Sequence, residues 1–143
     1  MKTFQGLVVI GALAMSGCAF MKPASNSNSS QALQSSGDVP AGEGTVMARE
    51  GGNGNTALTV KVKHLAPASR IEQDAQVYVV WVEPPNSPPQ NVGVLSVNRN
   101  LDGTLSTITP HKKFRVLITP EQNGQVDRPN GSEVFTSDVE RMD

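Results

Sequence analysis

Short runs in which apolar and polar residues alternate constrain the fold of this chain more than any other sequence feature. In residues 56–65, TALTVKVKHL, the aliphatic side chains of Leu58, Val60 and Val62 alternate with polar side chains. A period of two residues is typical of a β-strand that buries one face, whereas an amphipathic helix repeats its apolar residues every three or four positions. We find no convincing helical run, so the sequence predicts an all-β fold.

The same pattern predicts seven strands separated by turn residues. Their expected ranges are 45–50, 56–65, 76–84, 91–98, 104–109, 113–119 and 132–139. The segments GGNGN (51–55) and Asp102-Gly103 are typical of tight turns, because glycine adopts a positive φ without strain. Residues 66–75 have room for one helical turn at most. Seven short antiparallel strands in about 100 residues favour a single immunoglobulin-like β-sandwich, which we expect over residues 43–143.

Residues 76–84, QVYVVWVEP, are apolar on both sides and predict a central strand. Val77, Val79 and Trp81 share one side of this strand, and we expect Trp81 to lie in the core, packed between the two sheets. A disulfide between the sheets is excluded, because the chain has one cysteine. Packing must therefore stabilise the domain by itself.

The N-terminus has the organisation of a signal peptide. Met1 and Lys2 precede the apolar run LVVIGALAM (7–15), which is too short to span a bilayer, since a spanning helix needs roughly 20 residues. The run ends in Ser16-Gly17-Cys18. These residues resemble the lipobox of bacterial lipoproteins, with Met15 where leucine is usual. An alternative is a free thiol buried in a soluble helix, against which the polar tract after Cys18 argues.

In the lipoprotein family, the cysteine thiol receives a diacylglyceryl group and signal peptidase II cleaves before it. The resemblance implies that residues 1–17 are a signal peptide and that Cys18 is the lipidated N-terminus of a cell-envelope protein. Each buried CH₂ of an acyl chain contributes roughly 0.8 kcal/mol, so such an anchor is stable. Ala19 follows instead of the aspartate that favours inner-membrane retention. In a source with two membranes, we therefore expect the outer membrane, facing the periplasm.

Residues 19–42 are rich in serine, asparagine and glutamine and nearly free of aliphatic residues. Such a segment buries too little surface to offset the entropy of ordering it. We interpret residues 18–42 as the lipidated cysteine followed by a disordered, flexible linker that holds the domain away from the membrane.

The sequence contains no catalytic or metal-binding motif that we recognise. His64 and His111 lie at or just past the ends of predicted strands without metal-ligand spacing, so we expect exposed histidines. No serine stands in a G-x-S-x-G context. We therefore predict that the protein is not an enzyme and holds no cofactor or metal. With 12 basic and 13 acidic residues, the chain also lacks the basic excess of a nucleic-acid-binding protein.

Two segments are candidates for contact with a partner. EPPNSPPQN (83–91) is interpreted either as a rigid connection between two strands or as a docking loop for another envelope protein. Its prolines favour an extended, exposed polyproline conformation; they are Pro84, Pro85, Pro88 and Pro89. HKKFR (111–115) is either a solvated strand start or a contact to lipid headgroups or another polyanion.

Two further stretches resemble the extracytoplasmic C-terminal domain of anti-sigma-K factors. The first is YVVWVEP (78–84) continued by PQNVGVLSV (89–97), and the second is FRVLITPEQNGQVDRPNGSEV (114–134). The matching residues of the second stretch are Thr119, Glu121, Gly124, Pro129 and Gly131, whereas Pro120 precedes Glu121 instead of following it. The resemblance implies a small envelope β-sandwich over most of residues 76–139. Anti-sigma-K factors also carry a sigma-binding domain and a transmembrane helix, neither of which we expect here. Two functions remain open: a non-catalytic binding or structural module, or a sensory or regulatory domain related to these factors.

Overall fold

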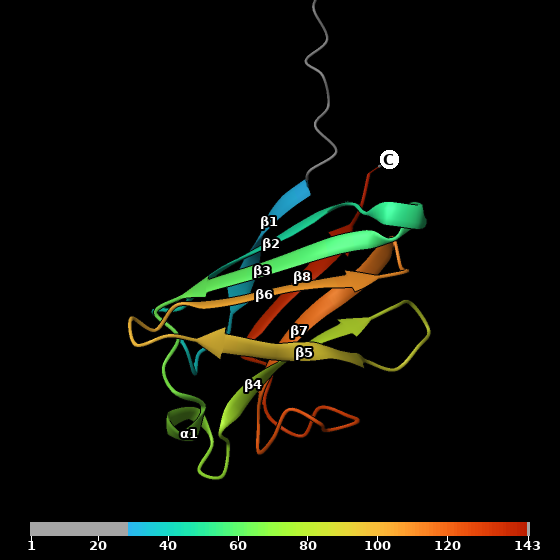
Figure 1. The fold of residues 1–143 in the computed structure, drawn as a ribbon. Helices are drawn as coiled ribbons and strands as arrows, with labels where there is room; N and C mark the ends of the chain where they lie inside the picture. Colours follow the sequence, from blue (N-terminus) through green and yellow to red (C-terminus); the bar gives the residue numbers. More distant parts are fainter. Residues whose placement is uncertain (1–28, 143) are drawn as a thin grey trace, which may run out of the picture.

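The structure is a computed structural model, which describes residues 29–142 (Figure 1). The described residues form eight strands, one short helix, α1 (Ala68–Ile71), and one 3-10 turn (Gly52–Gly54). The strands are β1 (Ser29–Ser35), β2 (Glu43–Glu50), β3 (Thr56–Lys63), β4 (Val77–Glu83), β5 (Gln90–Val97), β6 (Gly103–Thr109), β7 (Lys113–Glu121) and β8 (Phe135–Glu140). The prediction of an all-β fold is confirmed, and each predicted strand overlaps one of β2 to β8.

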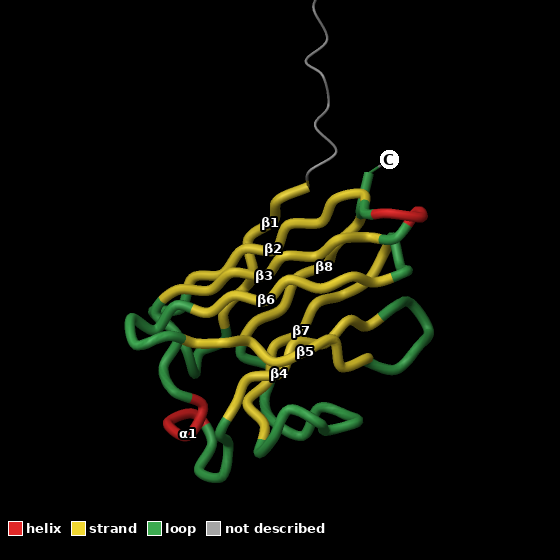
Figure 2. The backbone as a smooth tube through the Cα atoms, in the orientation of Figure 1, coloured by secondary structure: helices red, strands yellow, loops and turns green. Residues whose placement is uncertain are grey.

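The strands form a closed antiparallel barrel in the order β1-β2-β3-β6-β5-β4-β7-β8 (Figure 2). The structure thus differs from the predicted seven-strand sandwich, because its sheets are joined at two corners. At one corner β5 pairs with β4 through residues 90–95 and then with β6 through residues 96–97. In the β4–β5 register, Val80 lies opposite Gly93 and Trp81 opposite Asn91, so Val92 is an extra residue on β5, and Gly93 has a positive φ of 142°. Such a bulge bends its own strand and increases the local twist, which accompanies the change of partner.

Strand β1 closes the other corner, and it lies in the segment that we predicted to be a flexible linker. Residues 29–33 pair with residues 44–48 of β2, and residues 34–35 pair with residues 135–136 of β8. Leu33 is the one apolar side chain of β1 that is buried among those described. The linker prediction is therefore wrong for residues 29–42. Residues 1–28, with the predicted signal peptide and Cys18, lie outside the described residues.

The interior of the barrel is filled by aliphatic and aromatic side chains from its strands. Val60, Val80, Ile118 and Phe135 are fully buried there. On β3 the buried side chains alternate with more accessible ones, as the sequence pattern predicts. Strand β4 is instead buried on both faces. Its second face lies outside the barrel, so another part of the chain must cover it.

Trp81 belongs to that second face. Its side chain is fully buried, but it packs with Val79 and Leu117 in a cluster separate from the main core. Trp81 pairs with Leu117 in the β4–β7 register, whereas the neighbouring Val80 points into the barrel. The prediction that Trp81 is buried is confirmed, but the indole does not pack between two sheets, because the opposite set of β4 side chains faces the interior of the barrel.

Candidate functional site

The connection between β7 and β8, residues 122–134, covers the outer face of β4 and is held by a buried carboxylate. Glu121 is 3% exposed. Its Oε1 accepts hydrogen bonds from Thr119 Oγ1 at 2.7 Å, from the backbone N–H of Asn130 at 2.9 Å and from that of Gly131 at 3.2 Å. Trp81 Nε1 donates to Thr119 Oγ1 at 2.8 Å. Indole, hydroxyl and carboxylate thus form one chain of hydrogen bonds that ends on the loop backbone.

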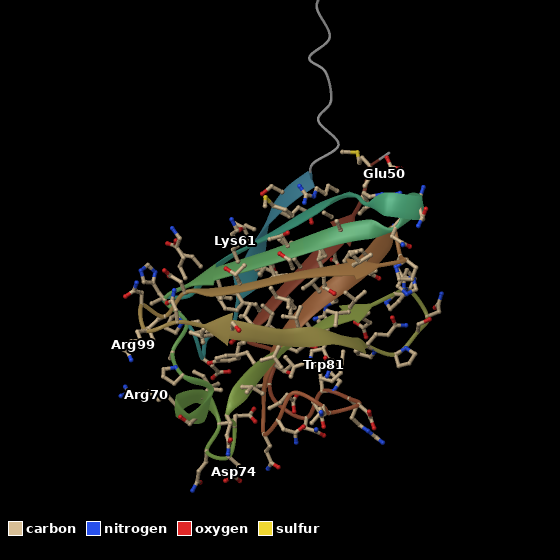
Figure 3. All side chains as sticks on the ribbon, viewed as in Figure 1. Glu50, Lys61, Arg70, Asp74, Trp81 and Arg99 are labelled. Atoms are coloured by element: carbon tan, nitrogen blue, oxygen red, sulfur yellow. The ribbon has the colours of Figure 1, made fainter. Side chains whose placement is uncertain are left out.

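Asn91 of β5 holds the same loop at a second point. Its Nδ2 donates to the carbonyl oxygens of Gly124 and Val126, each at 3.0 Å, and its Oδ1 accepts from the N–H of Gly93. Val126 packs on the cluster that contains Trp81, which Figure 3 labels beside this loop. Polar contacts to Glu121 and to Asn91, with apolar contact between them, therefore fix the loop.

Four of the five matching residues of the second stretch have structural roles in or beside this loop. Thr119 and Glu121 provide its hydrogen-bond anchor. A Cβ at Gly131 would overlap the carbonyl oxygen of Pro120, and a Cβ at Gly124 would overlap the side chain of Val94. Glycine is therefore required at position 131, where the close atom belongs to the backbone, whereas a side chain at position 124 would displace that of Val94. The sequence did not reveal the contributions of Asn91 and of the Trp81 indole, because these residues lie far from the loop along the chain.

Besides the β7–β8 loop, the structure has a cleft of about 900 Å³ beside the proline-rich loop. Residues 83–87 form one wall, residues 113–115 of β7 lie next to them, and residues 138–140 of β8 with Gln31 of β1 complete it. Of the four prolines that we proposed for docking, Pro84 and Pro85 line the cleft. Pro88 and Pro89 are not among its lining residues and lead into β5.

The proline-rich loop folds back at its start instead of running extended. The N–H of Ser87 donates to the carbonyl oxygen of Pro84 at 3.2 Å, and Asn86 has a φ of 58°. A positive φ at the third residue with proline at the second is typical of a type II turn. The expected extended polyproline conformation is therefore wrong for residues 84–87. The turn brings Pro85 and Asn86 to the wall of the cleft.

Arg115 is the central charge of the cleft. Its Nη2 lies 2.6 Å from Glu133 Oε2, and its Nη1 lies 3.5 Å from Glu83 Oε2. Burial lowers the pKa of Arg115, but the hydrogen bonds and negative charges of Glu133 and Glu83 outweigh burial and raise that pKa. Asp138 lies opposite Arg115 in the β7–β8 register and forms no ion pair with another described residue. The cleft therefore contains an engaged cation and an available carboxylate.

The basic run 111–115 does not form a joint aromatic and cationic surface. Lys112 and Lys113 are exposed, but Phe114 is 2% exposed and belongs to the interior of the barrel. Lys113 Nζ lies 3.7 Å from Glu140 Oε2, and both side chains are largely exposed. Exposed pairs of this kind contribute little to stability.

The two histidines are separated by the length of a strand. His64 follows the last residue of β3, whereas the carbonyl oxygen of His111 accepts a hydrogen bond from Thr56, the first residue of β3. His64 is exposed and His111 is half-buried. In residues 29–142, no group of three or more His, Cys, Asp or Glu side chains could hold a metal ion. Nor do these residues include a helix that is long and apolar enough to cross a membrane.

In comparisons with protein-family models, with curated proteins and with solved structures, nothing matches this chain. The candidate sites are therefore interpreted from their own geometry.

Proposed function

We propose that this protein is a lipid-anchored protein of the cell envelope whose β-barrel domain is a non-catalytic binding or structural module. The observation that carries the proposal is Ser16-Gly17-Cys18 directly after the apolar run 7–15, with Cys18 as the single cysteine of the chain. An unused thiol is a liability in an exported protein, and acylation removes it. The lipid would attach the protein to a membrane without a spanning segment.

We further infer that the domain is an immunoglobulin-like sandwich whose corners are closed. The neighbour order β2-β3-β6-β5 and β4-β7-β8 corresponds to the order A-B-E-D and C-F-G of immunoglobulin constant-type domains. In this interpretation, β1 is an added strand beside the first one, and the bulged β5 links the two sheets. A fold of this kind does not by itself imply a function. The binding role is supported by the cleft beside Arg115 and Asp138.

The alternative is a sensory or regulatory envelope domain related to anti-sigma-K factors. The observation that favours it is the connection of Thr119, Glu121 and Gly131 in one hydrogen-bond network, because these are residues of the resemblance. A gene for an extracytoplasmic sigma factor beside the gene of this protein would favour regulation. A neighbourhood without one would favour the binding or structural module.

The test is the chemistry of the N-terminus in a bacterial host. The mature protein is expected to begin at Cys18, to carry the mass of a diacylglyceryl group and to incorporate a palmitate analogue during growth. Cys18→Ser should abolish both the label and the cleavage, and it should leave the circular dichroism of the barrel unchanged. A wild-type protein that starts elsewhere and carries no label would refute the proposal. Separation of inner and outer membranes then tests the expected outer-membrane location.

A further inference from the structure

The barrel closes weakly between β1 and β8. Among the described residues, these strands pair only at residues 34–35 and 135–136. Beyond this point β1 continues along β2 back to residue 29, and β8 continues along β7 to residue 140. The two strands diverge as they leave their common end (Figure 1). We call the open stretch, residues 30–33 of β1 and 137–139 of β8, the seam.

The backbone of both strands directs hydrogen-bonding groups into the seam. The N–H of Ser36 donates to the carbonyl oxygen of Val134 at 2.9 Å. In an antiparallel ladder, every second residue directs its N–H and C=O to the same neighbour. Every second residue from Ser36 along β1, and from Val134 along β8, therefore directs its N–H and C=O toward the other strand. In this register the backbone groups of Ala32 and Asp138 face each other across the seam. The N–H of Arg141 donates instead to the carbonyl of Lys112, which agrees with odd-numbered residues of β8 bonding to β7.

Two adjoining cavities occupy the seam. The smaller, of about 260 Å³, is lined by residues of both strands, among them Ala32 and Ser137. The larger, of about 900 Å³, extends from there to the turn at residues 84–87. Gln31, Arg115 and Asp138 line both cavities. The larger cavity is within the size range of ligand sites, roughly 300–1,000 Å³, and the smaller one connects it to the seam.

Gln31 places an unsatisfied acceptor in this space. It pairs with Val46, whose side chain is in the core, so the Gln31 side chain lies on the inward face of β1. Its Oε1 is buried and has no hydrogen-bond partner. The corner between β5 and β6 is different, although it also has only two residue pairs between described residues. There Leu105 packs over Gly93, with Leu105 Cδ1 3.1 Å from the position of a Cβ on Gly93.

We propose that the seam binds an extended segment of a partner protein by strand addition, with a lysine or arginine of that segment against Asp138. An extended backbone supplies the alternating N–H and C=O groups that two open strand edges lack, and it supplies a donor for Gln31 Oε1. The positive charge that we propose for the partner follows from the ion pairs at the seam. Arg115 is engaged by Glu83 and Glu133, whereas the exposed Asp138 forms no ion pair with other described residues.

This inference rests on the proposed binding function and names the chemistry of the partner. The test uses the full-length chain in detergent micelles and follows its backbone amides by NMR. The probe is a short synthetic peptide of alternating valine and lysine. Saturable shifts are expected at Ala32 and Asp138. The same peptide with alternate amides N-methylated, or with glutamate for lysine, should bind at least tenfold more weakly.

Two variants of the chain separate the backbone contribution from the charge. Ala32→Pro removes the N–H that faces the seam without removing a bond of the β1–β2 ladder, so it should abolish the response of Asp138. Asp138→Lys should weaken binding of the valine-lysine peptide about tenfold. Asp127→Lys makes the same charge change in the exposed β7–β8 loop and should leave binding unchanged. Thermal melting shows whether each variant is folded. If Ala32→Pro does not fold, the comparison of Asp138→Lys with Asp127→Lys still tests the inference.

Several results would overturn the inference. These are the absence of saturable shifts at the seam, equal binding of the N-methylated peptide, or equal effects of Asp138→Lys and Asp127→Lys. A concentration-dependent dimer whose shifts map to the seam would assign the site to a second copy of the chain and would also overturn it. This experiment and the mass of the N-terminus test different claims. A lipidated protein whose seam shows no saturable shifts would refute strand addition and leave the lipid anchor standing.

Discussion

Replacing Trp81 by alanine should strongly destabilise the domain, although this side chain lies outside the barrel. The indole is fully buried between β4 and the β7–β8 loop, and it packs against Val79, Leu117 and Val126. It also begins the hydrogen-bond chain through Thr119. Truncation would therefore leave a cavity beneath the loop and remove the donor to the Thr119 hydroxyl.

The expected cost follows from the burial. Replacing a buried tryptophan by alanine typically lowers the free energy of unfolding by roughly 3–5 kcal/mol. Domains have about 5–15 kcal/mol of stability in total, so Trp81→Ala should leave the barrel barely stable. At about 4 °C for each kcal/mol in a domain of this size, the melting temperature should fall by roughly 12–20 °C. Trp81→Phe keeps most of the packing and loses the N–H donor, so it should cost about 1–2 kcal/mol.

Circular dichroism measures both variants, since Trp81 is the single tryptophan and fluorescence would be lost. Hydrogen exchange should show faster exchange at the Asn130 and Gly131 amides, because their anchor loses its support. The matched control is Ile108→Ala, whose side chain is 64% exposed and which should change stability by no more than about 0.5 kcal/mol. A Trp81→Ala protein that melts within a degree or two of wild type would refute the assignment of the indole to a buried position beneath the loop.

Three further predictions concern the loop and the barrel. Glu121→Gln should cost about 1–3 kcal/mol and accelerate exchange of the loop amides, because a charged acceptor of several hydrogen bonds is lost; unchanged exchange would contradict this. Gly131→Ala should lower the free energy of unfolding by about 1–3 kcal/mol, because its Cβ would overlap the Pro120 carbonyl. Gly52→Ala is the control, since its Cβ would meet no atom within 4 Å, and it should be neutral when both variants are unfolded with denaturant. Burial raises the pKa of Tyr78 to about 12 from 10.0, so the neutral phenol stabilises the fold below pH ~10, and roughly 2–3 kcal/mol of stability is lost as the pH rises to about 12. Since Tyr78 is the single tyrosine, an ultraviolet titration reports it alone, and a midpoint near pH 10 would contradict the prediction.

The strands β2 to β8 could be predicted from the sequence because their signal is local. In β3, neighbouring side chains point to opposite faces, so burial of one face appears directly as alternation of apolar and polar residues. The turn at residues 51–55 was similarly visible, because glycine and asparagine adopt backbone conformations that other residues avoid. The turn predicted at Asp102-Gly103 lies at residues 98–101 instead, where Leu101 has a φ of 65°, and Gly103 is the first residue of β6.

The candidate sites could be predicted only in part. The sequence drew attention to the proline-rich loop, but its turn at Asn86 and its position beside Arg115 depend on the pairing of β4 with β7. The buried network of Glu121 was missed, because Trp81 and Thr119 are 38 residues apart and only the β-sheet brings them together. A lone buried acceptor such as Gln31 Oε1 has no sequence signature at all.

By itself the sequence determined that the chain is all-β and where most strands lie, since side-chain alternation is a property of each strand alone. Tertiary structure decided the rest. Strand β1, SSQALQS, is polar and contributes Leu33 to the core, so it exists because β2 offers main-chain partners. Trp81 could face either way on a strand that is apolar on both sides, and the direction depends on which set of side chains fills the barrel. Closure of the barrel likewise depends on pairing between distant strands, which no local pattern encodes.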